Sequence, residues 1–155
     1  MRRHKAVRRK VIPDLKYGSI IVSQLINIVL KKGKLAVAQK IVYGMLDGIV
    51  EKKKSDSIEI FAKAIENVSP KIEVRNRRVG GATYQVPIEV SDDRQILLAL
   101  RWIFIGAKNR KGISMKDSLV QEILDAYDNT GYAIKKKNDT HKMAQANRAF
   151  ARFNW

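Results

Sequence analysis

The chain has 155 residues, a hydrophobic content of 45% and a formal charge of +16 at pH 7. This length favours one domain over residues 1–155, and the apolar content is sufficient for a buried core. The absence of cysteine excludes disulfides and thiolate metal sites, and no apolar run is long enough to cross a bilayer. Because 31 lysine and arginine side chains outnumber 15 acidic ones, we expect a polyanionic partner, with nucleic acid ahead of an anionic membrane.

Residues 1–10 form a basic N-terminal arm. The segment contains no acid and six basic side chains: Arg2, Arg3, Lys5, Arg8, Arg9 and Lys10. Like charges at this density repel one another and resist folding on their own. Two interpretations stay open, a solvated tail or an arm that becomes ordered on nucleic acid. The charge in the rest of the chain favours the second.

Apolar residues at helical spacing predict three helices before residue 70. We expect them over residues 19–33, 35–53 and 56–69, and the connection between the first two, residues 31–34, is basic. The third helix begins at a capping aspartate. It ends before Pro70, because proline disfavours helical backbone in the residue before it.

We expect residues 71–90 to form a two-stranded β-hairpin arm, in a chain whose other ordered segments are predicted to be helical. Apolar residues alternate with polar ones, the period of a half-buried strand, at Ile72 and Val74 and again at Tyr84, Val86, Ile88 and Val90. Between the runs, two adjacent glycines can take the positive φ that a hairpin tip needs. The tip-proximal half carries three arginines and no acid. An ordinary surface hairpin is the less favoured interpretation.

The apolar pattern also predicts the register of this hairpin. To place the apolar residues of both runs on one face, paired positions must differ by an even number. That register requires an odd loop, most simply one of about three residues, or a bulge. A strict two-residue turn at the glycines would instead place Arg75 opposite Val86. We therefore expect the odd loop.

Three further helices are expected after the arm, over residues 91–109, 114–130 and 132–150. Ser114 and Asp117 form a capping pair at the start of the second. The first has the strongest apolar face and is expected to be the central core helix. Within it, core packing is favoured over base stacking for Trp102. The last is weakly amphipathic and depends on packing or on its ligand. The sequence thus predicts a mainly α fold, a single helical domain of about six helices with a protruding two-stranded β-hairpin arm between helices three and four.

Charge is unevenly distributed along the chain. Residues 31–34, 71–78, 108–111 and 135–137 are strongly basic, whereas residues 114–130 carry four acids against one base. In a folded body this pattern predicts one basic face and one near-neutral face. A single lysine run is most often just a solvated surface, but several runs together with two basic arms favour phosphate binding.

The sequence shows no catalytic or metal-binding constellation. His4 and His141 are isolated, with no cysteine near either, so they do not form a metal site. The glycine pair in the arm is not followed by the Lys-Ser/Thr of a phosphate-binding loop. No nucleophile motif brings serine, histidine and acid together. We expect no enzymatic activity, no cofactor and no small-molecule substrate.

Residues 75–90, RNRRVGGATYQVPIEV, resemble the β-arm signature of the ribosomal protein S-seven family of the small subunit. The resemblance extends to residues 9–14, RKVIPD, and 17–19, YGS. It continues through ALRWI at 99–103 and HKMAQANRAF at 141–150. These blocks span almost the whole chain in family order, so the match is far more specific than a glycine pair between strands.

The resemblance implies a structural protein that binds the 3′ major domain of small-subunit rRNA and helps to organise and assemble the head. It implies a β-arm near exit-site tRNA and the mRNA exit path, with ribosomal protein S-eleven as a neighbour. The location would be the cytoplasmic ribosome, or an organellar ribosome for an organelle-encoded chain. The rRNA-binding residues that it implies are Arg2, Arg3, Lys5, Arg8, Arg9, Lys10, Lys31, Lys32, Lys34, Arg75, Arg77, Arg78, Arg94, Arg101, Lys108, Arg110, Lys111, Lys135, Lys136, Lys137, His141, Lys142 and Arg148. The candidates for tRNA and mRNA proximity are Gly80, Gly81, Ala82, Thr83 and Tyr84.

A β-arm architectural DNA-binding protein of the histone-like kind is the alternative. Helices, a basic arm and high charge would look similar by composition alone. That class, however, requires a short body that dimerises and a proline or apolar wedge at the arm tip, where this chain has Val-Gly-Gly-Ala.

One departure from the pattern of the ribosomal family is the acidic segment at 91–93, which leaves Arg94 as the base just beyond the second strand.

Overall fold

The computed structural model describes residues 11–153, so the predicted N-terminal arm lies outside the described residues. The elements, in chain order, are α1 (Ile20–Val29), α2 (Leu35–Lys53), α3 (Ser57–Val68), β1 (Ile72–Val79), β2 (Ala82–Glu89), α4 (Asp92–Asn109), α5 (Met115–Tyr127), α6 (Gly131–Ala146) and the 3-10 helix η1 (Arg148–Phe153). This order, with a two-stranded antiparallel hairpin between α3 and α4, confirms the predicted mainly α fold.

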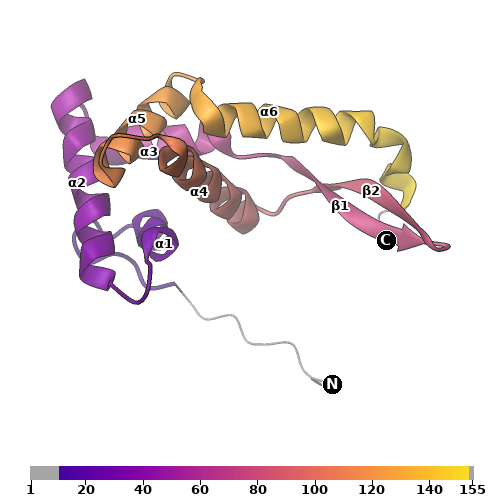
Figure 1. The fold of residues 1–155 in the computed structure, drawn as a ribbon, viewed down its shortest axis with the longest axis horizontal. Coiled ribbons are helices and arrows are strands. Elements are labelled where there is room, and N and C mark those ends of the chain that lie inside the picture. Colours follow the sequence, from indigo (N-terminus) through magenta and orange to yellow (C-terminus); the bar gives the residue numbers. More distant parts are fainter. Residues whose placement is uncertain (1–10, 154–155) are drawn as a thin grey trace.

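The helices and the arm occupy different parts of the molecule. Figure 1 shows α1 to α5 gathered into a helical body from which β1 and β2 extend, while α6 runs alongside the arm. The contacts agree with this view, because α6 packs against β1 and η1 packs against β2. The arm is therefore attached along its length by the end of the chain.

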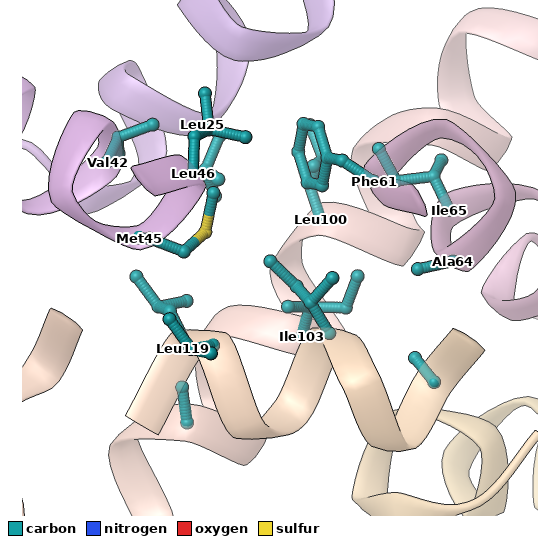
Figure 2. Packing of buried hydrophobic residues seen from close by; sticks show 14 of the residues in the cluster. Leu25, Val42, Met45, Leu46, Phe61, Ala64, Ile65, Leu100, Ile103 and Leu119 are labelled. Atoms are coloured by element: carbon teal, nitrogen blue, oxygen red, sulfur yellow. The ribbon is translucent and has the colours of Figure 1, made fainter. Parts of the chain in front are cut away.

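The core lies between the helices of the body. Figure 2 shows apolar side chains from α1 to α5 turned toward one another. Leu100 and Ile103 of α4 are fully buried among them, and α4 contacts α1, α3, α5 and α6. This arrangement places α4 in the core as predicted, but α5 contacts as many helices (α2, α3, α4 and α6), so the two helices share the central position. Trp102, also in α4, packs partly buried against the same cluster.

Two helices, α3 and α5, begin with a side-chain cap. The Asp56 carboxylate accepts a hydrogen bond from the Ile58 backbone N–H at 2.8 Å at the start of α3. The Ser114 hydroxyl oxygen accepts one from the Asp117 N–H at 3.2 Å at the start of α5. These bonds satisfy N–H groups that a helix leaves without internal partners, and both caps were predicted.

Two helices are shorter than predicted. The first was expected to reach residue 33 but α1 ends at Val29. Lys32 and Gly33 both have positive φ, at 52° and 73°, so the backbone has already turned out of the helix. The last was expected over 132–150, but α6 ends at Ala146 and the chain tightens into η1.

The predicted register of the arm is wrong. Val79 pairs with Ala82 and Arg75 pairs with Val86, which is the register of a strict two-residue turn. Gly80 and Gly81 both have positive φ, at 57° and 89°, and turns of this kind match the twist of hairpin strands.

The register places an acid where the sequence pattern had suggested an apolar residue. Glu73 pairs with Ile88 and is buried, whereas Ile72 is 39% exposed. The alternation of apolar residues was therefore a misleading guide to the inner face of β1. Ion pairs, described below, compensate the burial of Glu73.

Candidate nucleic-acid interface

Three lysines from two segments border one surface cavity. Lys31 and Lys34 come from the connection between α1 and α2, and Lys108 comes from the last turn of α4. The cavity has a volume of about 270 Å³, and its other lining residues are apolar: Val29, Val37, Ala38, Ile41, Phe104 and Met115. Three cations around an apolar floor, with no acid among the described lining residues, form a surface suited to phosphate groups and an unstacked base. Lys32 and Lys111 are also exposed on these two connections.

The exposed face of α4 extends this basic surface. Arg94, Arg101 and Lys108 are all exposed and lie seven residues apart along the helix. Seven residues are close to two turns, so the three side chains fall on one stripe. We call these residues the α4 stripe.

The first member of the stripe is held by an acid. Arg94 donates from Nε to both carboxylate oxygens of Glu73, at 2.8 and 2.9 Å, and its Nη2 lies 2.8 Å from the same group. Arg75 contacts this carboxylate at 2.7 Å. The side chain of Glu73 is only 10% exposed, while those of Arg75 and Arg94 are 53% and 45% exposed. We call Glu73, Arg75 and Arg94 the Glu73 clamp.

The three arginines of the arm do not form one patch. Successive side chains of a strand point to opposite faces, so Arg75 and Arg77 share a face and Arg78 lies on the other. Arg78 is exposed and Arg77 is half-buried opposite Tyr84. Two of the three remain available for phosphate, since Arg75 belongs to the clamp.

Arg110 lies in a different setting from the other predicted contacts. Its Nη2 is 2.8 Å from the carboxylate of Glu122 and also contacts Asp125, while Nη1 donates to Gln121 at 3.2 Å. The hydrogen bond to Glu122, with a further one to Asp125, raises the pKa of the Arg110 guanidinium. Two acids therefore balance its charge inside the protein. This placement supports a role in holding α4 to α5.

The basic residues of α6 divide into two groups. Lys135, Lys136 and Lys142 are exposed, as is Arg148 at the start of η1. Lys137 instead donates to the backbone carbonyl of Asn67 at 2.6 Å, and burial, together with the charge of Lys71, lowers its pKa.

His141 faces the base of the arm. Its Nε2 accepts a hydrogen bond from the Lys71 backbone N–H at 3.3 Å. Burial, followed by the charges of Lys137 and Lys71, lowers the pKa of His141. The imidazole is therefore held neutral, as an acceptor, in contact with the protein's own backbone.

The tip of the arm combines exposed backbone with one packed ring. Gly80, Gly81, Ala82 and Thr83 are exposed. The Tyr84 ring is half-buried and lies 5.3 Å from the Phe150 ring of η1, with an interplanar angle of 49°. The structure thus shows the Tyr84 ring packed against another part of the same chain.

Sequence reasoning missed the two acids that organise these arginines. Glu73 was treated as a polar residue of an exposed strand face, and Glu122 as part of a near-neutral face. The only signal for the first was an arginine two positions further along the same strand face. Nothing in the sequence indicated that Arg94 would reach it from another element.

Within residues 11–153, no group of three or more His, Cys, Asp or Glu side chains could hold a metal ion. None of the helices in this range combines the length and apolar character needed to cross a membrane.

These features define a class of protein: a small helical body with a projecting arm, whose cations lie on several elements and suit an extended polyanion. A family model described as "Ribosomal protein S7p/S5e" matches residues 1–148. The chain therefore belongs to this family of ribosomal proteins. This result agrees with the prediction that the chain is not an enzyme.

Individual relatives match over the full length. The chain is 58% identical to a protein of Thermotoga neapolitana and 59% identical to one of Thermotoga petrophila, with 100% of each chain covered in both cases. It is 53% identical to a protein of Azorhizobium caulinodans, with 99% of each chain covered. Each of these relatives is named "Small ribosomal subunit protein uS7".

Proposed function

We propose that the chain is a structural constituent of the small ribosomal subunit, which binds the 3′ major domain of small-subunit rRNA and helps to organise and assemble the head. The observation that carries this proposal is the full-length similarity to relatives named as small-subunit ribosomal proteins. The basic surfaces support it, because they are spread over loops, helices and the arm. Cytoplasmic ribosomes are the proposed location, in keeping with the bacterial relatives.

The proposed mode of binding is recognition of RNA shape. The deep groove of A-form RNA is closed to side chains, so a protein recognises folded RNA through phosphates, 2′-hydroxyls and unstacked bases. Arg101 and Lys108 of the α4 stripe, with Lys31 and Lys34 across the cavity, supply cations at several points of one surface. The apolar floor, which includes Phe104, supplies a surface for a base.

The arm is proposed to reach exit-site tRNA and the mRNA exit path, with ribosomal protein S-eleven as a neighbour. Its tip has two glycines with positive φ and exposed small side chains. Backbone that carries no large side chain can approach another backbone closely. The residues proposed to lie near tRNA and mRNA are Gly80, Gly81, Ala82, Thr83 and Tyr84.

Site-directed cleavage of RNA tests these placements. The chain has no cysteine, so a hydroxyl-radical source can be tethered to one introduced thiol at a time, at Ala82→Cys in the arm or Lys111→Cys on the body. The proposal predicts cuts in the 3′ major domain from both positions and cuts in exit-site tRNA from the arm alone. Cuts confined to another rRNA domain would refute it.

A further inference from the structure

We propose that Glu73 is a positioning residue for the arm. By holding Arg94 and Arg75 together, its carboxylate fixes the direction in which the arm leaves the helical body, so that the arm meets RNA already oriented. The consequence for RNA binding depends on the function proposed above, whereas the consequence for the free protein does not. Neither arginine of the clamp is then primarily a phosphate ligand.

The clamp joins β1 of the arm to α4. The arm packs against α6 and η1, and these contacts include the rings of Tyr84 and Phe150. Its attachment to α4 goes through side chains: Arg94 reaches Glu73 on β1, and Gln95 donates to the carbonyl of Val90, just after β2, at 2.8 Å. Of these two links, only the clamp reaches into a strand of the arm.

The chemistry of the clamp gives it directional strength. An arginine that donates to both oxygens of a carboxylate is fixed in orientation as well as distance, because the guanidinium is a planar fork. The carboxylate is 10% exposed, so opening the clamp would leave a buried acid without its partners, which is strongly unfavourable. An arm that is already oriented in the free protein loses less conformational entropy when it binds RNA.

The α6 side supplies the opposing support. His141 accepts from the Lys71 backbone N–H, and Asn147 donates to the Gln85 side chain at 3.3 Å. Gln85 lies on the opposite face of the arm from Glu73, as the register and the alternation of side chains require. The arm is thus attached to α6 through Lys71 and Gln85 and to α4 through the clamp. Tyr84, on the same face as Glu73, packs against Phe150 of η1.

The proposal makes a prediction of opposite sign to simple electrostatics. Glu73→Gln removes one negative charge from a chain of formal charge +16, and more positive charge should tighten RNA binding. The positioning role predicts weaker binding instead, by about tenfold. Without the clamp the free arm is no longer oriented, so it loses more conformational entropy when it binds RNA. Glu89→Gln is the matched control. It makes the same charge change at the exposed base of β2, on the other face of the arm, and should leave affinity unchanged or slightly higher.

A double-mutant cycle separates positioning from direct contact. If Arg94 acts through Glu73, the double variant Glu73→Gln with Arg94→Gln should bind about as well as either single variant. If Arg94 is an independent phosphate ligand, the two effects add. In that case Arg94→Gln also lowers the log–log salt slope by about 0.7 to 0.9.

The decisive readout is the arm itself, measured without RNA. Spin labels at Ala62→Cys on α3 and Asn76→Cys on β1, both exposed positions, report the distance between body and arm. The proposal predicts one narrow distance distribution for the parent protein and for Glu89→Gln, and a broad one for Glu73→Gln. If Glu73→Gln does not fold, Arg94→Lys keeps the charge without the fork and should broaden the distribution in its place.

An unchanged distribution in the folded Glu73→Gln or Arg94→Lys variant would overturn the proposal, as would affinity that rises in Glu73→Gln as it does in the control. If the parent protein shows no preference for small-subunit rRNA, the proposed function fails. The distance measurement still decides whether the clamp orients the arm.

Discussion

Arg110 and Glu122 form an ion pair that joins the end of α4 to the middle of α5, with Nη2 of the arginine 2.8 Å from a carboxylate oxygen of the glutamate. The glutamate side chain is 1% exposed, and its other oxygen accepts from the Ala133 backbone N–H at 3.0 Å at the start of α6. One carboxylate therefore connects three helices. A Cβ added at Gly106 would lie 2.6 Å from it, so α4 must have a glycine where the two helices meet.

Arg110→Met should destabilise the protein without a matching loss of RNA binding. The substitution leaves Glu122 buried with its main partner removed, at a cost of about 3 kcal/mol. Chemical denaturation measures the stability, and the salt dependence of RNA affinity measures the phosphate contacts. The neighbouring exposed Lys111→Met is the control, with a stability change within about 0.5 kcal/mol. A stable Arg110→Met variant with a reduced salt slope would show that Arg110 binds phosphate.

The lysines around the cavity should account for part of the salt dependence of RNA binding. Replacing Lys31, Lys34 and Lys108 with glutamine should lower the log–log salt slope by about 2, since each phosphate contact contributes about 0.7 to 0.9. The fold should survive, because all three side chains are exposed.

A second triple variant controls for the loss of three charges. Lys52, Lys63 and Lys116 are exposed on α2, α3 and α5, and none is a predicted contact. Changing all three to glutamine removes the same charge from other surfaces and should alter the slope much less. Equal slopes in the two variants would mean that net charge, and not this cavity, governs binding.

Leu100→Ala should destabilise the body by about 2 to 5 kcal/mol, the range for removing a buried leucine side chain. Leu100 is fully buried at the centre of the core, as Figure 2 shows. Leu97→Ala, one turn earlier in the same helix and partly exposed, should cost clearly less. Urea unfolding measures both. A small loss at Leu100 would contradict the central position of α4.

The histidine at the base of the arm should make stability depend on pH. Burial lowers the pKa of His141 below its ordinary value of 6.5, so the unfolded chain takes up this proton at a higher pH than the folded protein does. Stability present above about pH 6.5 is therefore lost as the pH falls toward the lower folded pKa. Protonation also removes the acceptor for the Lys71 N–H and places a third cation beside Lys71 and Lys137.

His141→Gln tests this assignment, because an amide oxygen can accept the same hydrogen bond and does not titrate in this range. Unfolding free energies measured between about pH 5 and 7.5 should fall with decreasing pH more steeply in the parent protein than in the variant. Parallel curves would show that other groups cause the dependence.

Most of the fold could be predicted from the sequence because it follows local rules. Apolar periodicity located all six helices of the described part of the chain, and the capping residues Asp56 and Ser114 marked two of their starts. The end of α1 was misplaced, because the backbone leaves the helix at Leu30, where ψ is 124°, and leucine is not a residue that marks a helix end.

The two errors at the candidate site have a common physical origin in long-range ion pairs. The arm register was missed because an acid on the inner face of β1 looks unfavourable until Arg94 arrives from α4. Arg110 was grouped with its basic neighbours because the acids that surround it come from another helix. Alternation and charge runs describe one segment at a time, so they cannot show which distant side chain will satisfy a buried carboxylate.

The central claim is that the chain recognises the shape of small-subunit rRNA, and competitive binding at near-physiological salt tests it most directly. A labelled fragment of the 3′ major domain would compete with equal lengths of duplex DNA and of unrelated structured RNA. The account predicts a preference of about a hundredfold or more for the rRNA fragment, a gap that specific contacts add to non-specific phosphate binding. Equal affinity for all three would contradict it and would favour an architectural DNA-binding protein.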